Sequence, residues 1–210
     1  MTDNGSRQPR AEIGVLGGTF NPVHNGHLRL AEFVLGNLEL DEVRLVPANI
    51  PPHKNPPEIS AEHRAAMVEL AVTGSPGIVC DRRELGFFGP SFSVRTIGSL
   101  ARDFPDAGLH LILGLDAFLG LPSWYRWWKI AELCRFVVVN RPGTGQPEPY
   151  PDWWQELIDE HGASVVEYLQ MDPYDISATE LRRRISNDES VDGLLPDNVI
   201  HYIRDNHLYV

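Results

Sequence analysis

The chain has few cysteines and no long apolar run. These two features argue against a disulfide-rich or cysteine-ligated metal protein and against a membrane-spanning one. Its two cysteines, Cys80 and Cys134, match no metal-binding or redox spacing, so we expect buried thiols in a reducing compartment. No segment approaches the roughly 18 apolar residues of a membrane-spanning helix, and the polar start lacks the apolar middle of a secretion signal. We expect a cytoplasmic protein with no membrane partner, in which residues 1–10 form a disordered tail and residues 11–210 a single domain.

Positive charge is also scarce. Lysine and arginine number 18 against 29 aspartates and glutamates, which gives a net charge of −11. A chain this acidic is a poor candidate for nucleic-acid binding. Its only lysines, Lys54 and Lys129, do not stand in a glycine-rich Walker loop. An anionic ligand would therefore need donors gathered locally, which indicates a small ligand in a pocket.

What the chain does contain is an alternation of short apolar runs and helical patterns. This alternation predicts a Rossmann-like, doubly wound parallel sheet of the α/β class, with helices on both faces and a small C-terminal helical elaboration. The predicted strands are 12–16, 42–47, 78–81, 109–113, 135–140 and 164–168. The predicted helices are 26–38, 61–73, 93–104, 124–133, 153–161, 178–186 and 197–206. Proline-rich loops follow the second and fifth strands, at the edge where open α/β sheets bind ligands.

The most informative segment follows the first predicted strand and runs from Gly17 to Leu28. Gly17 and Gly18 would let a ligand approach the backbone and would permit positive φ. His24 and His27 are spaced to lie on one face at a helix N-terminus, where both could donate to phosphate oxygens. A zinc site is the alternative, although no glutamate or cysteine pair supplies a third ligand. The glycines do not form the Gly-x-Gly-x-x-Gly pattern of dinucleotide dehydrogenases.

A second group of anion donors stands about 150 residues later, in the segment 176–182. Ser177, Thr179 and Arg182 combine two hydroxyls and a guanidinium near a predicted helix start. Ser177 with Glu180 also has the spacing of a capping box, a plain helix-start device. The two interpretations are compatible because capping and phosphate binding use the same helix end.

Together the two segments resemble the paired signatures of the nucleotidyltransferase superfamily, His-x-Gly-His and Ile-Ser-x-Thr-x-x-Arg. Ala178 replaces the usual second serine of the later signature. The loop Pro51–Lys54, the segment Pro90–Ser93 and Gly114–Asp116 are similar to the bacterial nicotinate-nucleotide adenylyltransferases in particular. Arg95 departs from that family, which usually has an acidic residue there, and we expect this change to alter how the neighbouring loop docks.

The resemblance implies adenylyl transfer from ATP, with Mg²⁺, to nicotinate mononucleotide. It implies that His24 and His27 are the catalytic donors. The residues that it implies for ATP are Gly17, Gly18, Thr19, Phe20, Ser177, Thr179 and Arg182. The residues that it implies for the acceptor are Lys54, Ser93, Asp116, Trp124, Tyr125 and Arg141. Trp127 and Trp128 are expected to pack in the core, and no residue is assigned to a resident metal.

Three alternatives stay open at this point. The acceptor could be nicotinamide mononucleotide or phosphopantetheine. The protein could be a non-catalytic nucleotide sensor, or a metallohydrolase if the histidines held zinc. The sequence also leaves a homo-oligomer possible.

Overall fold

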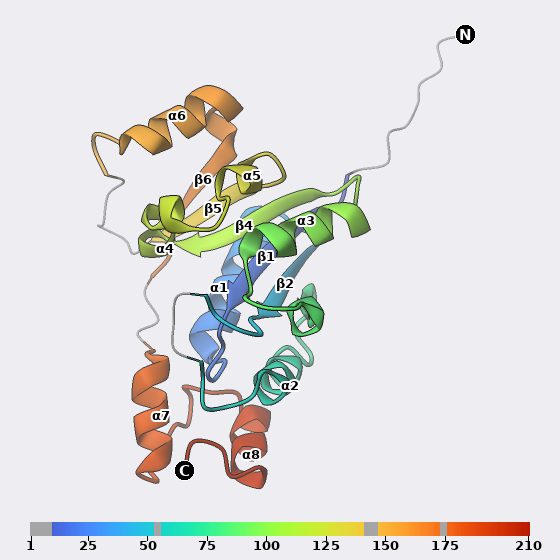
Figure 1. Cartoon of the computed structure of the whole chain (residues 1–210). Helices are drawn as coiled ribbons and strands as arrows, with labels where there is room; N and C mark the ends of the chain where they lie inside the picture. The colour runs from blue at the N-terminus through green and yellow to red at the C-terminus, as the bar shows by residue number, and fades with distance from the viewer. Residues whose placement is uncertain (1–9, 53–55, 141–146, 173–175) are drawn as a thin grey trace.

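A single parallel sheet forms the centre of the protein, as the alternating pattern predicts (Figure 1). The computed structural model describes residues 10–52, 56–140, 147–172 and 176–210. Within them, six strands are hydrogen-bonded in the order β3-β2-β1-β4-β5-β6, and each neighbouring pair is parallel. The strands are β1 Glu12–Gly18, β2 Glu42–Pro47, β3 Ile78–Cys80, β4 Gly108–Gly114, β5 Arg135–Asn140 and β6 Val166–Gln170.

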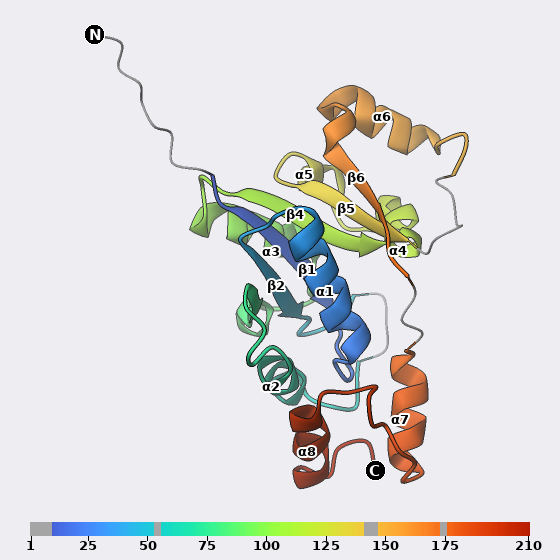
Figure 2. The same cartoon turned by 180° about the vertical axis from the view of Figure 1, so that it is seen from behind.

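Helices cover both faces of this sheet, each over its own apolar core. Side chains alternate along β5, so that Phe136 and Val138 enter one core while Val137 and Val139 enter the other. Helix α3 lies over one face in Figure 1, and α1 lies over the opposite face in Figure 2. Helices α1 Asn25–Asn37, α2 Ala61–Ala71, α7 Ala178–Ser186 and α8 Asp197–Asp205 contribute to the first core. Helices α3 Ser93–Asp103, α4 Leu115–Leu119, α5 Trp128–Ala131 and α6 Asp152–His161 contribute to the second.

The strand order places a switch point at the carboxyl ends of β1 and β4. The chain runs from β1 outward to β2 and β3, and then returns to the other side of β1 as β4. Connections leave in opposite directions at such a point, and this opens a crevice that α/β proteins use for ligands. Gly17 and Gly18, the last residues of β1, lie at this crevice.

The predicted helix over residues 124–133 is wrong for most of its length. Trp124 is extended (φ −79°, ψ 143°), and Arg126 has a positive φ of 52°, so that only the single turn α5 is helical. A non-glycine residue at positive φ cannot continue a right-handed helix. Helix α4 and a 3₁₀ turn at Leu121–Ser123 precede this stretch and were not predicted.

Smaller corrections concern the ends of elements. Strand β1 runs two residues further than predicted, and β6 is displaced toward the C-terminus because a 3₁₀ turn occupies Ala163–Val165. A further 3₁₀ turn covers Arg83–Gly86, after β3. Residues 1–9 of the predicted tail lie outside the described residues, and Arg10 donates to the carbonyl of Ala107 at 2.8 Å.

The predicted C-terminal helical elaboration is present as α7 and α8. These helices lie beyond the sheet, on the side where α1 begins (Figures 1 and 2). Across the described part of the chain, every helix is too short or too polar to span a membrane.

Candidate functional site

The first part of the site is the loop between β1 and α1. A Cβ atom on Gly17 would meet no atom within 4 Å, so the backbone there faces open space. Positive φ, which the two glycines would permit, occurs instead at Phe20 (φ 47°). The Phe20 ring lies against Gly18, where an added Cβ would come within 2.9 Å of it. Gly17 therefore leaves room for a ligand, whereas Gly18 leaves room for Phe20.

His24 and His27 lie together at the start of α1, as predicted. His24 is the residue before the first helical turn, and the two imidazole rings stack with centroids 3.7 Å apart. The backbone N–H of His24 donates to Nδ1 of His27 at 3.2 Å. A neutral imidazole carries one proton, so this bond assigns the proton of His27 to Nε2. His27 is thus held as an Nε2–H donor.

Burial keeps both imidazoles neutral. It lowers the pKa of His24 to about 4. Burial, together with the neighbouring His24, lowers the pKa of His27 well below 6.5. Nδ1 of His24 is a buried polar atom with no hydrogen-bond partner of acceptable geometry in the described chain. A buried atom of this kind commonly marks a place where a ligand or water completes the hydrogen bonding.

The second signature reaches the same loop from the far end of the sequence. Arg182, on α7, donates from Nη1 to the carbonyl of Asn21 at 2.8 Å and from Nη2 to the Thr179 hydroxyl at 3.2 Å. Ser177 accepts from the N–H of Glu180 at 3.4 Å and so caps α7. Ser177 and Thr179 are both exposed. The structure therefore brings the two signatures together.

The other arginines of α7 form ion pairs with neighbouring glutamates. Arg183 pairs with Glu180 at 2.8 Å and with Glu189 at 2.6 Å, and Arg184 pairs with Glu180 at 3.0 Å. Glu180 thus bonds these arginines, which leaves the capping box half formed. Arg182 remains the arginine of α7 that is directed toward the loop before α1.

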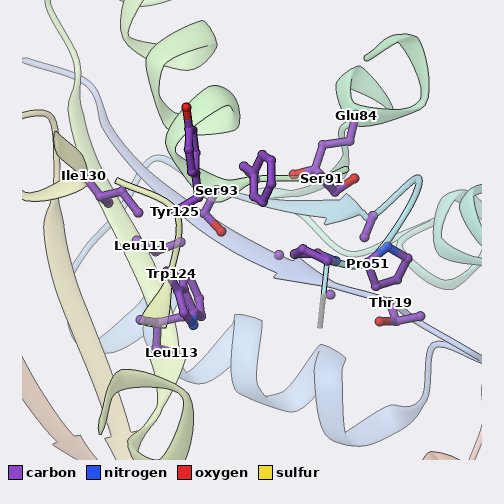
Figure 3. Close-up of a pocket in the computed structure, with 15 residues that line it drawn as sticks. Thr19, Pro51, Glu84, Ser91, Ser93, Leu111, Leu113, Trp124, Tyr125 and Ile130 are labelled. Carbon is purple, nitrogen blue, oxygen red and sulfur yellow. The ribbon is translucent and has the colours of Figure 1, made fainter. Parts of the chain in front are cut away.

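A cavity of about 180 Å³ opens beside Gly17, Gly18 and Thr19 (Figure 3). Three residues predicted for the acceptor, Ser93, Trp124 and Tyr125, line it. Phe92 lies against Tyr125, with ring centroids 4.7 Å apart. The remaining lining residues are Ala48, Pro51, Pro52, Glu84, Ser91, Leu111, Leu113 and Ile130. The cavity is therefore a mostly apolar slot that ends at the backbone of the loop between β1 and α1. Its shape suits a flat ring carrying a phosphate.

Asp116 lies apart from this slot. It lines a second cavity at the ends of β4 and β5, together with Gly26 of the histidine motif and Asn140. The structure therefore separates Asp116 from the other acceptor residues that it describes. Lys54 and Arg141 lie outside the described residues.

The remaining tryptophans of this region divide between core and surface. Trp127 packs against Trp153, with ring centroids 5.6 Å apart, in agreement with a core role. Trp128 is 53% exposed, so its predicted core packing is wrong. The positive φ at Arg126 turns the chain before Trp128, and the helical face assumed from the sequence does not exist there.

Arg95, the residue that departs from the family pattern, contacts the neighbouring loop. Its Nη1 donates to the carbonyl of Phe88 at 2.7 Å, and its guanidinium lies 4.7 Å from the centre of the Phe87 ring. The loop carries Phe88, whose side chain is almost wholly exposed.

Arg64 is a site residue whose part the sequence did not reveal. It is only 1% exposed, and its guanidinium donates to the carbonyls of Thr19 at 2.6 Å, Asn49 at 3.0 Å and Ile59 at 3.3 Å. Arg64 thereby joins the loop between β1 and α1 to the loop after β2. On the sequence it is one of many charged residues in a helix, and nothing in the helical pattern separates it from a solvent-facing arginine.

A metal held by protein ligands finds no support in the residue geometry. In the part of the chain that the structure describes, no group of three or more His, Cys, Asp or Glu side chains is arranged to hold a metal ion. The two histidines contact each other and Phe20, with the Phe20 and His27 centroids 4.9 Å apart.

Comparison with known proteins matches this geometry. A family model described as cytidylyltransferase-like matches residues 15–184, which include both signatures. The chain is 42% identical over 208 residues to a probable nicotinate-nucleotide adenylyltransferase of Aeromonas hydrophila, covering 94% of this chain and 96% of that protein. It is 39% identical over 203 residues to one of Hydrogenovibrio crunogenus, covering 94% and 97%.

Among solved structures, a similar fold is that of a Plasmodium falciparum nicotinic acid mononucleotide adenylyltransferase complexed with NaAD. The TM-score is 0.71 at 16% identity, and the match covers 95% of this chain and 98% of that one. At this identity the likeness shows the fold alone.

Proposed function

Because the chain belongs to the nicotinate-nucleotide adenylyltransferase family of cytidylyltransferase-like proteins, we propose that it transfers an adenylyl group from ATP to nicotinate mononucleotide. The products are nicotinate adenine dinucleotide and pyrophosphate, in the biosynthesis of NAD. The observation that carries the proposal is the convergence of His24, His27 and Arg182 on one loop beside a slot that fits a flat ring.

The reaction suits a site made of hydrogen-bond donors. A phosphate monoester has a second pKa near 6, so the acceptor phosphate is already a competent nucleophile at neutral pH. One of its oxygens attacks the α-phosphorus of ATP, a new P–O bond forms, and the bond to pyrophosphate breaks. The protein must then align two polyanions and stabilise the charge that develops on the transferred group.

His27 is proposed to stabilise that charge through Nε2–H. The bond from the His24 backbone occupies Nδ1, so the ring keeps a fixed donor without needing a positive charge. His24 stacks on this ring and is proposed as the second donor. The backbone of residues 17–20 would cradle the phosphates, with room for them beside Gly17.

Ser177, Thr179 and Arg182 are proposed to bind the leaving β- and γ-phosphates. Arg182 already contacts the loop at Asn21, and the exposed hydroxyls of Ser177 and Thr179 have room for further hydrogen bonds. Mg²⁺ would enter with ATP and neutralise part of the triphosphate charge, since it prefers phosphate oxygens and water to a cage of protein ligands.

The acceptor is proposed to place its pyridine ring in the slot between Trp124 and the first turn of α3. The N-terminal N–H groups of that helix favour an anion, which suits the carboxylate of nicotinate. Asp116, in the second cavity beside Gly26, is proposed to contact a ribose hydroxyl. Lys54 is proposed to bind the acceptor phosphate, and Arg141 is proposed to bind another part of the acceptor.

Two alternatives are separable from this function. Nicotinamide mononucleotide differs from the proposed acceptor by one carboxylate, and the helix N-terminus at the slot favours the acid. A non-catalytic nucleotide sensor would bind ATP without releasing pyrophosphate.

We also propose a cytoplasmic location, where both free cysteines would stay reduced.

One assay tests the function. Pyrophosphate release from Mg-ATP is followed with nicotinate mononucleotide, nicotinamide mononucleotide or phosphopantetheine offered separately. We expect release with nicotinate mononucleotide and at least tenfold lower kcat/KM with the amide. ATP binding without release for any acceptor would identify a sensor, and a preference for another acceptor would reassign the substrate.

A further inference from the structure

A buried carboxyl group that the proposed reaction does not use lies beside the acceptor slot. Glu84, in the 3₁₀ turn after β3, is 5% exposed and lines the cavity next to Ser91 (Figure 3). Burying a glutamate side chain in an apolar wall is costly. We therefore expect Glu84 to have a function at this position.

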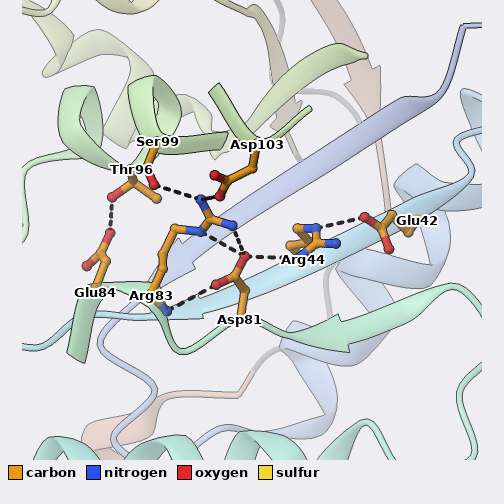
Figure 4. A network of polar contacts seen from close by, with 8 residues as sticks. All are labelled: Glu42, Arg44, Asp81, Arg83, Glu84, Thr96, Ser99 and Asp103. Carbon is orange, nitrogen blue, oxygen red and sulfur yellow. Dashed lines mark hydrogen bonds and ion pairs between the residues drawn. The ribbon is translucent and has the colours of Figure 1, made fainter. Parts of the chain in front are cut away.

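The carboxyl group of Glu84 lies beside two hydroxyl groups that are five residues apart. Thr96, buried in α3, donates from Oγ1 to Oε1 of Glu84 (Figure 4). The Ser91 hydroxyl lies close enough to this carboxyl group to lower its pKa. The Ser91 oxygen already accepts from the N–H of Asn49 at 2.9 Å, so its own hydrogen is available for Glu84.

These two hydroxyls enclose the start of α3. Phe92 and Ser93, which line the slot, stand between them in the sequence. The N–H of Arg95 bonds to the carbonyl of Phe92 at 2.9 Å, which leaves the N–H groups of Ser93 and Val94 without acceptors inside the helix. Glu84 is therefore bonded to Thr96 at one end of the turn that contains Ser93, and lies beside Ser91 at the other end.

Among the residues that the structure describes, no ion pair joins Glu84 to a cation. Arg83 directs its guanidinium to Asp81 at 2.8 Å and to Ser99 and Asp103 at 3.0 Å each (Figure 4). Burial raises the pKa of Glu84 above its usual value, and nearby Asp81 adds to this rise while the two hydroxyls and Arg83 oppose it. A buried carboxyl group that forms no ion pair within the described part of the chain is costly to desolvate and adds little stability. Its value lies in the geometry that it imposes.

We propose that Glu84 is a positioning residue for the pyridine acceptor. By holding Ser91 and Thr96 it fixes the first turn of α3, so that the free N–H groups and Ser93 meet the acceptor carboxylate. This inference rests on the proposed function, and it predicts a defect confined to the acceptor rather than shared with ATP.

The first test compares Glu84→Gln with Asp103→Asn. Glutamine keeps the volume but replaces one carboxylate oxygen by an NH2 donor, so one hydroxyl must turn from donating to accepting and the charge-assisted bond is lost. We expect the KM for nicotinate mononucleotide to rise about tenfold, the loss of about 1.4 kcal/mol, with the KM for ATP within twofold of the wild type. Asp103→Asn removes a contact of α3 with Arg83 away from the slot, and both of its KM values should stay near those of the wild type.

A second pair of variants separates positioning from simple loss of stability. Thr96→Val removes the hydroxyl that donates to Glu84, whereas Thr96→Ser keeps it. We expect Thr96→Val to raise the acceptor KM as Glu84→Gln does, and Thr96→Ser to restore it to within threefold of the wild type. Thermal unfolding of each variant confirms that the measured protein is folded.

The inference is overturned if Glu84→Gln leaves the acceptor KM unchanged, or raises the KM of both substrates equally. It is also overturned if the two Thr96 variants behave alike. The wild type is assayed first, because absence of turnover with nicotinate mononucleotide contradicts the proposed function itself. An active wild type with an unaffected Glu84→Gln variant contradicts the positioning role alone.

Discussion

The neutral state of His24 makes the ligand-free protein sensitive to acid in a predictable way. The pKa of His24 is about 4 in the folded protein, against 6.5 for an ordinary histidine. Between these two pH values the unfolded chain binds more protons than the folded one, so stability falls as the pH falls through 6.5 and levels off below 4. Over the whole range the difference of about 2.5 pKa units corresponds to about 3 kcal/mol, of which about 2 kcal/mol is lost between pH 7 and pH 5.

The substitution His24→Asn isolates this contribution. Asparagine is a favourable residue before a helix, so the start of α1 should be kept. Urea unfolding at pH 7 and at pH 5 gives the change in unfolding free energy for each protein. We expect the wild type to lose about 2 kcal/mol more than His24→Asn over this interval. Titrating groups away from the loop are present in both proteins and cancel to first order. His27 loses the part of its pKa shift that His24 causes, and this adds to the expected difference in the same direction.

The outcome that would refute this reasoning is an equal loss in the two proteins. Equal losses would mean that His24 titrates near its ordinary value in the folded state and is solvated there. The role of burial in keeping His24 neutral would then have to be given up.

Three further predictions concern activity and stability. His27→Ala should lower kcat by about 10²–10³-fold with the fold intact, since one donor to the transferred phosphate is lost; near-normal turnover in steady-state assays would exclude that role. Trp124→Ala should raise the KM for nicotinate mononucleotide at least fivefold more than the KM for ATP, and equal effects would place Trp124 outside the acceptor slot. Arg64→Met should lower the unfolding free energy by about 3 kcal/mol in urea titrations, because it leaves buried carbonyls unpaired; an unchanged unfolding midpoint would contradict the joining role of Arg64.

Much of the fold was predictable because apolar periodicity reflects burial. Strand β5 is buried on both faces and reads as an unbroken apolar run, which is the pattern of a central parallel strand. The region after β4 was not predictable in this way. Its tryptophans suggested one amphipathic helix, but the positive φ at Arg126 breaks it, and no local pattern signals such a backbone conformation at an arginine.

The residues of the candidate site also differ in whether the sequence alone could identify them. His24, His27 and Arg182 could be assigned because their types and spacings match the chemistry of an anion site, and the structure brings them to one loop. Arg64 and Glu84 could not be assigned, because their importance comes from burial among neighbours distant in the sequence. A charged side chain in a helical or turn pattern is ordinarily solvated, and only the three-dimensional packing distinguishes these two.

The contacts of Asn21 have a consequence for the order in which the enzyme can become active. Arg182 holds the carbonyl of Asn21, and the hydroxyl of Tyr209 donates to its side chain at 2.7 Å. On the ribosome, the histidine loop emerges long before either partner has been synthesised. The two contacts of Asn21 therefore cannot form until Arg182 and Tyr209 have been synthesised. A peptide fused directly after Tyr209 would disturb the loop that contains Asn21, although Tyr209 and Asn21 are 188 residues apart in the sequence.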